Sequence, residues 1–329
     1  MSKSAGISAI GYHLPSKIVS NNDLEIMVNT SDEWIKSRTG IKERRVVADN
    51  ENCSDIAVKA CRKVLNKAQL SPEDIDLILF TSLSPDMLCP STASIIQGKL
   101  ELVNAAAFDV SAACAGFTFA LTTAESFIIS GKYKNILVVG AEAISRLINW
   151  KDRNTCILFG DGAGVALVQP VEHPYGILES YLENDGNKSH YIEIPAGASA
   201  QPASENTLKN NEHFLKMKGQ EVFKFAVRVI PHAINKVLSK TDIKIEEVDL
   251  FIPHQANLRI IEAAAKKLNI NKNKFFTNLE KLGNTSTASV PIALEQAIQD
   301  GHLKKGDIVV IVGFGAGLSL GANLIRWSY

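Results

Sequence analysis

Three side chains, a thiol, an imidazole and a carboxamide, stand in sequence settings that suit acyl transfer. Cys114 lies between a strand-like and a helix-like segment, in the run Ser111-Ala112-Ala113-Cys114-Ala115-Gly116-Phe117. Near the first turn of a helix, unpaired N–H groups and the helix dipole favour a thiolate. His254 and Asn284 lie far downstream in otherwise apolar surroundings. A cysteine nucleophile with separate His and Asn partners is typical of acyl-transfer enzymes.

Each of these residues also has an ordinary structural interpretation. A free cysteine is most often a small buried apolar residue, and we interpret Cys53, Cys61 and Cys156 in that way. Cys114 differs because small residues on both sides leave room for a ligand. His254 stands out among the histidines because His-Gln-Ala-Asn places three polar side chains at a strand-to-helix corner. We therefore expect one shared site.

Two glycine-rich runs, residues 160–164 and 313–317, resemble phosphate-binding loops. A dinucleotide fingerprint needs a following helix and an acidic residue about twenty positions further on. The first run precedes another strand-like segment, and the second lies too close to Tyr329 for such a unit. Both runs predict tight strand turns, and the second can present backbone N–H groups to an oxyanion.

The elements that must position the site occur twice along the chain. Residues 76–140 and residues 249–313 have equal length, and each reads as a strand, a helix, a strand, a long helix and a strand. We expect a duplicated α/β fold with one half in residues 1–172, carrying the cysteine, and another in residues 173–329, carrying the histidine and asparagine. Prolines punctuate the junction.

The repeat also extends to the candidate site. Cys114 precedes Gly131 by as many positions as Asn284 precedes Gly301. Each glycine follows an amphipathic segment, as a C-terminal helix cap would. This spacing predicts that Cys114 and Asn284 occupy equivalent places in the two halves.

Composition limits the partners and the compartment. With 35 basic and 35 acidic residues the formal net charge is zero, which argues against nucleic acid. The 5 cysteines, odd in number and without a CxxC pair, argue against a disulfide framework or zinc site and for a reducing compartment.

The chain carries no obvious membrane signal. Glycines interrupt the uncharged stretch between Asp307 and Arg326, which therefore predicts two buried strands rather than a membrane span. The N-terminus has no apolar leader. We expect a cytoplasmic protein without a membrane partner. The polar residues 195–211 predict a surface loop.

Taken together, the motifs resemble β-ketoacyl-acyl-carrier-protein synthase III along essentially the whole chain. They are Asp32-Glu33-Trp34-Ile35, Arg38-Thr39-Gly40-Ile41, Ala113-Cys114-Ala115-Gly116-Phe117, Gly160-Asp161-Gly162-Ala163-Gly164, His254-Gln255-Ala256-Asn257-Leu258-Arg259 and Gly283-Asn284-Thr285-Ser286. The resemblance implies a thiolase-type duplicated fold in five layers, αβαβα, and a homodimer.

The same resemblance implies the reaction that starts type II fatty-acid synthesis. An acyl group, commonly acetyl, moves from coenzyme A to Cys114 and then condenses with malonyl-acyl carrier protein, which loses carbon dioxide. His254 and Asn284 would stabilise the enolate, and the N–H groups of Cys114 and Ala316 would form the oxyanion hole. No metal or redox cofactor is implied.

Binding roles follow from the resemblance in the same way. Coenzyme A would contact Trp34, Arg38, Arg153, Gly219, Phe223 and Asn257, with its adenine between Trp34 and Arg153. The acidic carrier protein would dock on Lys224, Arg259, Lys266 and Lys267. The local excess of basic residues in 256–281 supports an acidic partner independently.

One departure from the family pattern leaves the starter acyl group open. Cys89 stands where many members carry Phe at the acyl pocket, reached across the dimer, so a chain longer than acetyl could fit. A condensing enzyme with a different starter, of the polyketide or alkylquinolone type, would keep the same three residues. A catalytically silent subunit that only binds carrier protein would not need them.

Overall fold

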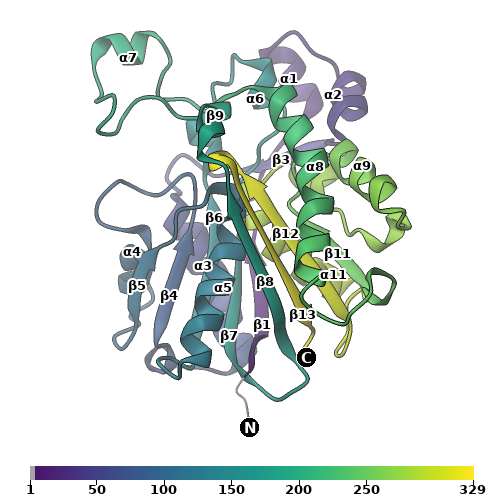
Figure 1. Cartoon of the computed structure of the whole chain (residues 1–329). Coiled ribbons are helices and arrows are strands. Elements are labelled where there is room, and N and C mark those ends of the chain that lie inside the picture. Colours follow the sequence, from purple (N-terminus) through teal and green to yellow (C-terminus); the bar gives the residue numbers. More distant parts are fainter. Residues whose placement is uncertain (1–3) are drawn as a thin grey trace.

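Two mixed β-sheets form the frame of the molecule (Figure 1). The computed structural model describes residues 4–329. The first sheet has the order β1 (Ser4–His13), β7 (Gly162–Val171), β6 (Ile136–Glu142), β4 (Leu77–Thr81) and β5 (Ala106–Asp109). The second has the order β11 (Leu250–Pro253), β12 (Ile308–Gly315), β13 (Ser319–Arg326) and β8 (Gly176–Asn184).

Helices complete five layers. Between the sheets lie α5 (Gly116–Ile129) and α11 (Ser289–Gln299), which contact strands of both. The outer face of the first sheet carries α3 (Cys53–Ala68) and α4 (Thr92–Lys99), and that of the second carries α8 (Gly219–Leu238) and α9 (Leu258–Leu268). The expected α/β fold with αβαβα layers is confirmed.

The central strands are buried on both faces because helices cover them. Every residue of β4, β6, β11 and β12 is buried, as continuous apolar runs in parallel pairs require. β5 differs, since it is the edge strand of its sheet and three of its four residues are exposed.

The remaining α-helices and strands are short. They are β2 (Lys17–Ser20), α1 (Asn21–Met27), α2 (Asp32–Thr39), β3 (Glu43–Val46), α6 (Arg153–Cys156), β9 (Ile192–Glu193), α7 (Glu205–Lys209), β10 (Lys216–Met217) and α10 (Leu279–Leu282). The interpretation of residues 195–211 as a loop without helix is wrong at α7, whose first turn is capped by the Ser204 hydroxyl.

The uncharged C-terminal stretch consists of two paired strands, as expected. β12 and β13 are antiparallel and joined by a glycine-containing turn at residues 316–318. Within residues 4–329 no helix is both long enough and apolar enough to cross a membrane.

Equivalent strands of the two sheets pair in the same register. Leu77 lies opposite Ile136 in the β4–β6 pair, and Leu250 lies opposite Val309 in the β11–β12 pair. The residue before β4 and the residue before β11 are both aspartates that make the same kind of hydrogen bond. Asp76 accepts from the Asn135 N–H, and Asp249 accepts from the Ile308 N–H. The duplicated pattern therefore has a consistent alignment.

That alignment shows that the expected equivalence of Cys114 and Asn284 is wrong. The short 3₁₀ turns Ala113–Ala115 and Ser286–Ala288 stand directly before α5 and α11, so Thr287 matches Cys114. Asn284 lies two residues before its turn. The equal spacing to Gly131 and Gly301 was misleading because the helices that these glycines follow differ in length: α5 has 14 residues and α11 has 11.

Candidate active site

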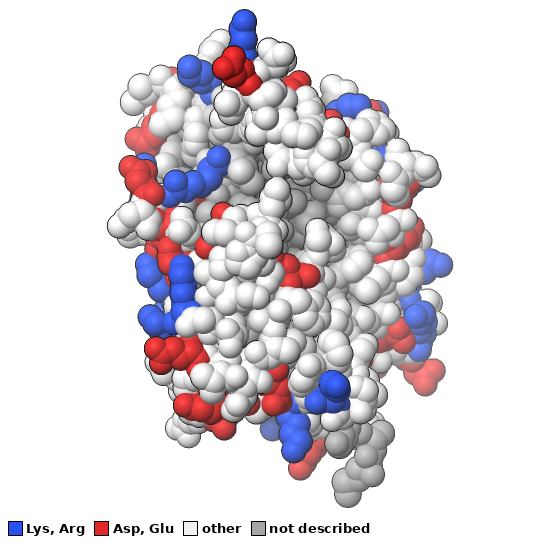
Figure 2. Space-filling view, turned by 90° about the vertical axis from the view of Figure 1, so that its left-hand side faces the viewer, with Lys and Arg blue, Asp and Glu red and all other residues white. Residues whose placement is uncertain are grey.

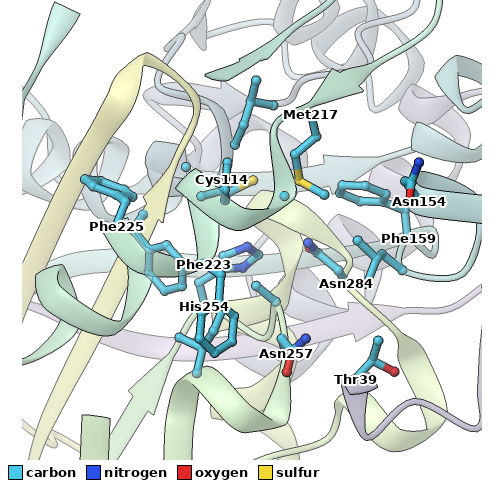
Figure 3. A pocket seen from close by; sticks show the side chains of 18 of the residues that line it. Thr39, Cys114, Asn154, Phe159, Met217, Phe223, Phe225, His254, Asn257 and Asn284 are labelled. Atoms are coloured by element: carbon cyan, nitrogen blue, oxygen red, sulfur yellow. The ribbon is translucent and has the colours of Figure 1, made fainter. Parts of the chain in front are cut away.

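One cavity of about 740 Å³ brings the three predicted residues together. It opens between α2, α8 and α9 and ends at Cys114, His254 and Asn284, which Figure 3 shows facing the same space. All three are nearly buried, with exposed fractions of 7%, 2% and 6%. The walls are mainly apolar, with Leu83, Leu158, Phe159, Ile192, Leu215, Met217, Val222, Phe225, Ile260 and Phe314 among them.

The thiol of Cys114 is held in a backbone kink at the N-terminal side of α5. The preceding Ala113 has a φ of 48°, a left-handed conformation that a non-glycine residue rarely adopts. The backbone of Gly315 packs so closely that an added Cβ would lie 3.1 Å from the sulfur. Only glycine leaves room there for both the thiol and a ligand.

Cys114 is a thiol rather than a thiolate in this site. Burial raises the pKa of Cys114 to about 12. A hydrogen bond from Ser286 lowers this pKa, but its effect is smaller than that of burial. The expectation that the helix terminus would favour a thiolate is therefore wrong for the resting site, because desolvation outweighs it. The sulfur must lose its proton during the reaction.

His254 follows β11 and points into the cavity from the second half. Its Nδ1 lies 2.7 Å from Ser289 Oγ, and its ring packs edge-on against Phe314 with centroids 5.1 Å apart. Burial lowers the pKa of His254 to about 3, so the imidazole is neutral at physiological pH. A neutral ring can donate one hydrogen bond without carrying charge.

The buried neutral imidazole predicts a pH-dependent stability. In the unfolded chain the ring binds a proton below about pH 6.5, whereas the folded pKa of about 3 keeps it neutral. Stability is therefore lost as the pH falls from 6.5 toward 3, by on the order of 1 kcal/mol per pH unit. Urea unfolding of wild type and His254→Gln at pH 7 and pH 4.5 measures this, since the variant should lack the extra loss. Equal losses in both proteins would contradict the assignment.

Asn284 is fixed by hydrogen bonds at both its backbone and its side chain. Its N–H donates to the Leu158 carbonyl at 2.8 Å, and its carbonyl accepts from the Gly160 N–H at 3.0 Å. The Ser286 N–H donates to Oδ1 at 2.8 Å. Because Oδ1 is engaged, the NH₂ group of the carboxamide is directed toward the cavity as a donor (Figure 3).

Cationic and aromatic side chains gather at the mouth of the cavity. The guanidinium carbon of Arg153 lies 4.7 Å from the centroid of the Trp34 ring, and that of Arg38 lies 6.0 Å from it. Trp34 and Arg38 line the cavity. Arg153 is placed outside the lining, exposed, with its Nη1 donating to the Asn29 carbonyl at 2.9 Å.

The other residues expected to bind coenzyme A also lie at this mouth. Gly219 and Phe223, in the first turns of α8, line the cavity together with Asn257. The side chain of Asn257 is already used, since Oδ1 accepts from the Arg259 N–H and Nδ2 donates to the Arg38 carbonyl. It therefore caps α9 and ties that helix to α2.

The residues expected to dock a carrier protein form an exposed basic group on α8 and α9. Lys224 and Arg259 line the cavity mouth, and the Arg259 guanidinium lies 5.7 Å from the Phe223 ring. Lys266 and Lys267 stand in the last turn of α9, outside the cavity and exposed. The group therefore extends from the mouth outward along α9.

Two further predicted residues, Ala316 and Cys89, do not line this cavity either. Ala316 lies in the turn after Gly315, which does. Cys89 is exposed on the loop between β4 and α4, next to the exposed apolar side chains of Met87 and Leu88. Its expected contact with an acyl pocket requires a second copy of the chain.

The glycines of residues 160–164 lead into β7, as expected for a strand turn, and they allow neighbouring segments to pack closely. A Cβ on Gly160 would lie 2.3 Å from the Leu282 carbonyl oxygen, and one on Gly164 would lie 2.7 Å from Pro291. β7 begins at Gly162 and packs against α11. No group of three or more potential metal ligands occurs in residues 4–329.

Sequence reasoning missed three polar residues behind the cavity. Ser286 contacts both Cys114 and Asn284, Ser289 contacts His254, and Glu142 is completely buried nearby. The motif around Asn284 included Ser286, but nothing in it indicated a contact with the thiol. Glu142 ends an apolar strand, where a carboxylate is usually solvated.

The chain is similar to known proteins along nearly its whole length. Family models described as 3-oxoacyl-[acyl-carrier-protein (ACP)] synthase III match residues 108–186 and, for its C-terminal part, residues 238–327. A β-ketoacyl-[acyl-carrier-protein] synthase III of Caldanaerobacter subterraneus subsp. tengcongensis is 53% identical over 324 residues, which cover 98% of each chain. The synthase III of Natranaerobius thermophilus is 49% identical over 326 residues, 98% of this chain and 99% of that one.

A solved structure extends the similarity to three dimensions. The crystal structure of 3-oxoacyl-[acyl-carrier-protein] synthase III from Aquifex aeolicus VF5 superposes with a TM-score of 0.91 at 46% identity. The match covers 98% of this chain and 100% of that chain.

Proposed function

Because the chain belongs to the family of β-ketoacyl-[acyl-carrier-protein] synthase III enzymes, we propose that Cys114, His254 and Asn284 divide its two half-reactions between them. The protein is an acyltransferase that condenses an acyl-coenzyme A with malonyl-acyl carrier protein and so initiates fatty-acid synthesis. The observation that carries the assignment is the meeting of these three side chains, from both halves of the chain, at the end of one buried cavity.

In the first half-reaction, Cys114 attacks the acyl thioester and coenzyme A leaves. Negative charge develops on the carbonyl oxygen, and preorganised N–H donors stabilise it most effectively in a site that excludes water. The Cys114 N–H and the N–H of Ala316, in the turn after Gly315, are the donors we assign. The close approach of Gly315 to the sulfur supports this assignment.

In the second half-reaction, His254 and Asn284 bind the thioester oxygen of the malonyl group. Loss of carbon dioxide leaves an enolate, whose carbon attacks the acyl group on Cys114. Two neutral donors suit this step, since neither has to change its protonation state. His254 donates from Nε2 when the Ser289 hydroxyl donates to Nδ1, and Asn284 donates from the NH₂ group that Ser286 leaves free.

The mouth residues suit the nucleotide end of coenzyme A. We assign the adenine to the Trp34 face, with Arg38 and the first turns of α8 (Gly219, Phe223) along the path to Cys114. Arg153 already covers the ring at 4.7 Å, so a base would enter between them after Arg153 swings outward. Asn257 contributes by holding α2 and α9 together.

Trp34→Ala is expected to raise the KM for acyl-coenzyme A about tenfold and to leave kcat nearly unchanged. Loss of one stacking and cation–π surface removes roughly 1–2 kcal/mol of binding that ground state and transition state share. Steady-state kinetics with varied acyl-coenzyme A measures this. Lys305→Ala is the matched control, because it removes a cation–π contact with Tyr175 away from the cavity. An unchanged KM in Trp34→Ala would rule out the adenine assignment.

The exposed basic group suits an acidic carrier protein. Lys224 and Arg259 lie at the cavity mouth, and Lys266 and Lys267 continue outward on α9. A carrier docked there could pass its malonyl arm down the same opening. The charge attraction would act mainly on the rate of encounter, and salt would weaken it.

A homodimer would cover an apolar face and complete the acyl pocket. The edge strand β5 and the loops before and after α4 present the exposed apolar side chains of Phe108, Met87, Leu88 and Val103. Figure 2 views this side and shows few charged side chains across its middle. A second copy on this face could bring its Cys89 to the pocket, and that exposed thiol is smaller than the Phe that many members carry.

The division into residues 1–172 and 173–329 remains our proposal for two related halves, supported by the matched strand register. Five free cysteines fit a reducing compartment such as the cytoplasm.

The acyl preference is tested with a panel of acyl-coenzyme A thioesters and malonyl-acyl carrier protein, scored by product mass. Acetyl-derived product is expected, and a preference for longer chains would trace to the smaller side chain at Cys89.

A further inference from the structure

A carboxylate with no assigned role lies behind the nucleophile. Glu142, at the end of β6, is completely buried, and no Lys, Arg or His of residues 4–329 forms an ion pair with it. A buried carboxylate without a cation is costly to keep. The titratable groups that face it are the thiols of Cys114 and Cys53.

The hydrogen bonds around Glu142 favour its ionised form. The Leu83 N–H donates to Oε1 at 3.0 Å, and the hydroxyls of Ser84 and Ser82 donate to Oε2 at 2.5 and 3.1 Å. Each hydroxyl also accepts a backbone N–H, from Ala143 and from Ser84 respectively, and keeps its own proton to donate to the carboxylate. Donors alone surround the carboxylate, which leaves it free to accept a proton.

Ser286 connects this carboxylate to the sulfur. Its Oγ donates to Cys114 Sγ at 3.2 Å, and its side chain also lies close enough to Glu142 to lower the pKa of that carboxyl. The backbone of Ser286 adopts a left-handed conformation with a φ of 47°. The N–H of Ser286 donates to Asn284 Oδ1, which fixes this conformation. One hydroxyl proton cannot serve sulfur and carboxylate at once, so its position must depend on the charge of each.

We propose that Ser286 and Glu142 form a proton relay behind Cys114, with Glu142 as a positioning residue that acts through the Ser286 hydroxyl. This inference deepens the proposed function, on which it rests, by assigning where the thiol proton goes. His254 is a poor alternative acceptor, because burial disfavours its protonated form. Burial has the opposite effect on Glu142, since it raises the pKa of that carboxyl.

During acylation the relay removes one proton from the sulfur. As the Cys114 sulfur bonds to the acyl carbon, its proton passes to Ser286 Oγ, whose own proton passes to Glu142. The bond between the acyl carbon and the sulfur of coenzyme A breaks, and that thiolate takes a proton from solvent at the cavity mouth. The thiol and the carboxylate have then become an S-acyl group and a carboxylic acid, so the site has lost its one negative charge.

During condensation the same proton returns. The enolate carbon attacks the acyl group, and the bond from that group to Cys114 breaks. The departing sulfur accepts the Ser286 proton, which Glu142 replaces. The overall reaction therefore consumes one proton, the one that coenzyme A took from solvent, and the relay restores the resting thiol.

A simple electrostatic role for Glu142 makes the opposite prediction. The negative carboxylate raises the pKa of the Cys114 thiol, so its removal alone should make the thiol more reactive. The relay predicts a less reactive thiol, because the proton acceptor is lost. The sign of the change therefore separates the two roles.

The test is the rate at which iodoacetamide alkylates Cys114, followed by mass spectrometry of the peptide that contains it. In wild type we expect a nearly flat rate between pH 6 and 8. In Glu142→Gln we expect a rate about 100-fold lower at pH 6.5 that rises tenfold per pH unit. Ser286→Ala should lower the rate at least about tenfold, since it removes the donor to the thiolate. Ala113 already adopts the same left-handed backbone, so alanine is compatible with that position.

Asp161→Asn is the matched control. Asp161 is equally buried and accepts hydrogen bonds from the Val47 N–H and from the N–H and hydroxyl of Ser145, but it does not contact the sulfur. It should keep the flat profile. Faster alkylation in Glu142→Gln, or a flat and unchanged rate there, would overturn the relay. Because alkylation needs no thioester, a failed relay and a wrongly assigned nucleophile give different results.

Discussion

Replacing Cys114 by alanine is expected to abolish the acyl-enzyme and to lower the overall rate by at least about 10⁴-fold. The substitution removes the atom that bonds to the acyl group, and no other thiol lines the cavity among residues 4–329. Incubation with acyl-coenzyme A and measurement of the intact protein mass detects the acyl group directly. Wild type should gain one acyl mass and the variant none.

The control for this experiment is another buried cysteine. Cys61 is buried, like Cys114, but it lies in α3 on the outer face of the first sheet, away from the cavity. Cys61→Ala should acquire the acyl group as wild type does. An acyl mass on Cys114→Ala would show that a different nucleophile operates, and the proposed division of roles would fall with it.

His254→Ala and Asn284→Ala are expected to keep acylation and to lose condensation. Each variant removes one donor from the enolate oxygen, which typically costs about 3–4 kcal/mol in the barrier, or roughly 10²–10³-fold in rate. The intact protein mass follows the first half-reaction, and the release of carbon dioxide or of 3-oxoacyl product follows the second. Normal condensation in both variants would refute the enolate role.

A second asparagine variant separates chemistry from folding. Asn284→Asp keeps the oxygen that accepts from the Ser286 N–H, while it replaces the donor group by a second oxygen. The local loop should therefore persist. Condensation should fall at least as far as in Asn284→Ala, because a carboxylate would also repel the enolate.

The parts of the fold that depend on local pattern were predictable from the sequence. Continuous apolar runs indicated the buried strands, and glycines in residues 313–317 indicated a strand turn rather than a membrane span. The thiol, imidazole and carboxamide were identified because each stands in a corner between elements. These features require only the neighbours of a residue along the chain.

Features that depend on contacts between distant segments were not predictable. Ser286 and Glu142 lie far apart in the sequence, and only the packing of α11 against the first sheet brings one to the other. The thiol pKa depends on how completely the cavity is closed, which no local motif reports. The mistaken pairing of Cys114 with Asn284 arose because helix length can change between copies while strand register does not.

The distribution of charge along the cavity has a consequence for inhibitor design. Its cations, Arg38, Lys224 and Arg259, stand at the opening, while the inner end presents a protonated thiol, a neutral ring and a carboxamide. A compound with an acid at its inner end would lose hydration and meet no cation. A compound in the reverse orientation would fit the cavity. Its anionic group would stay at the opening beside the cations, a narrow apolar chain would follow the apolar walls, and an uncharged electrophile would reach the Cys114 sulfur.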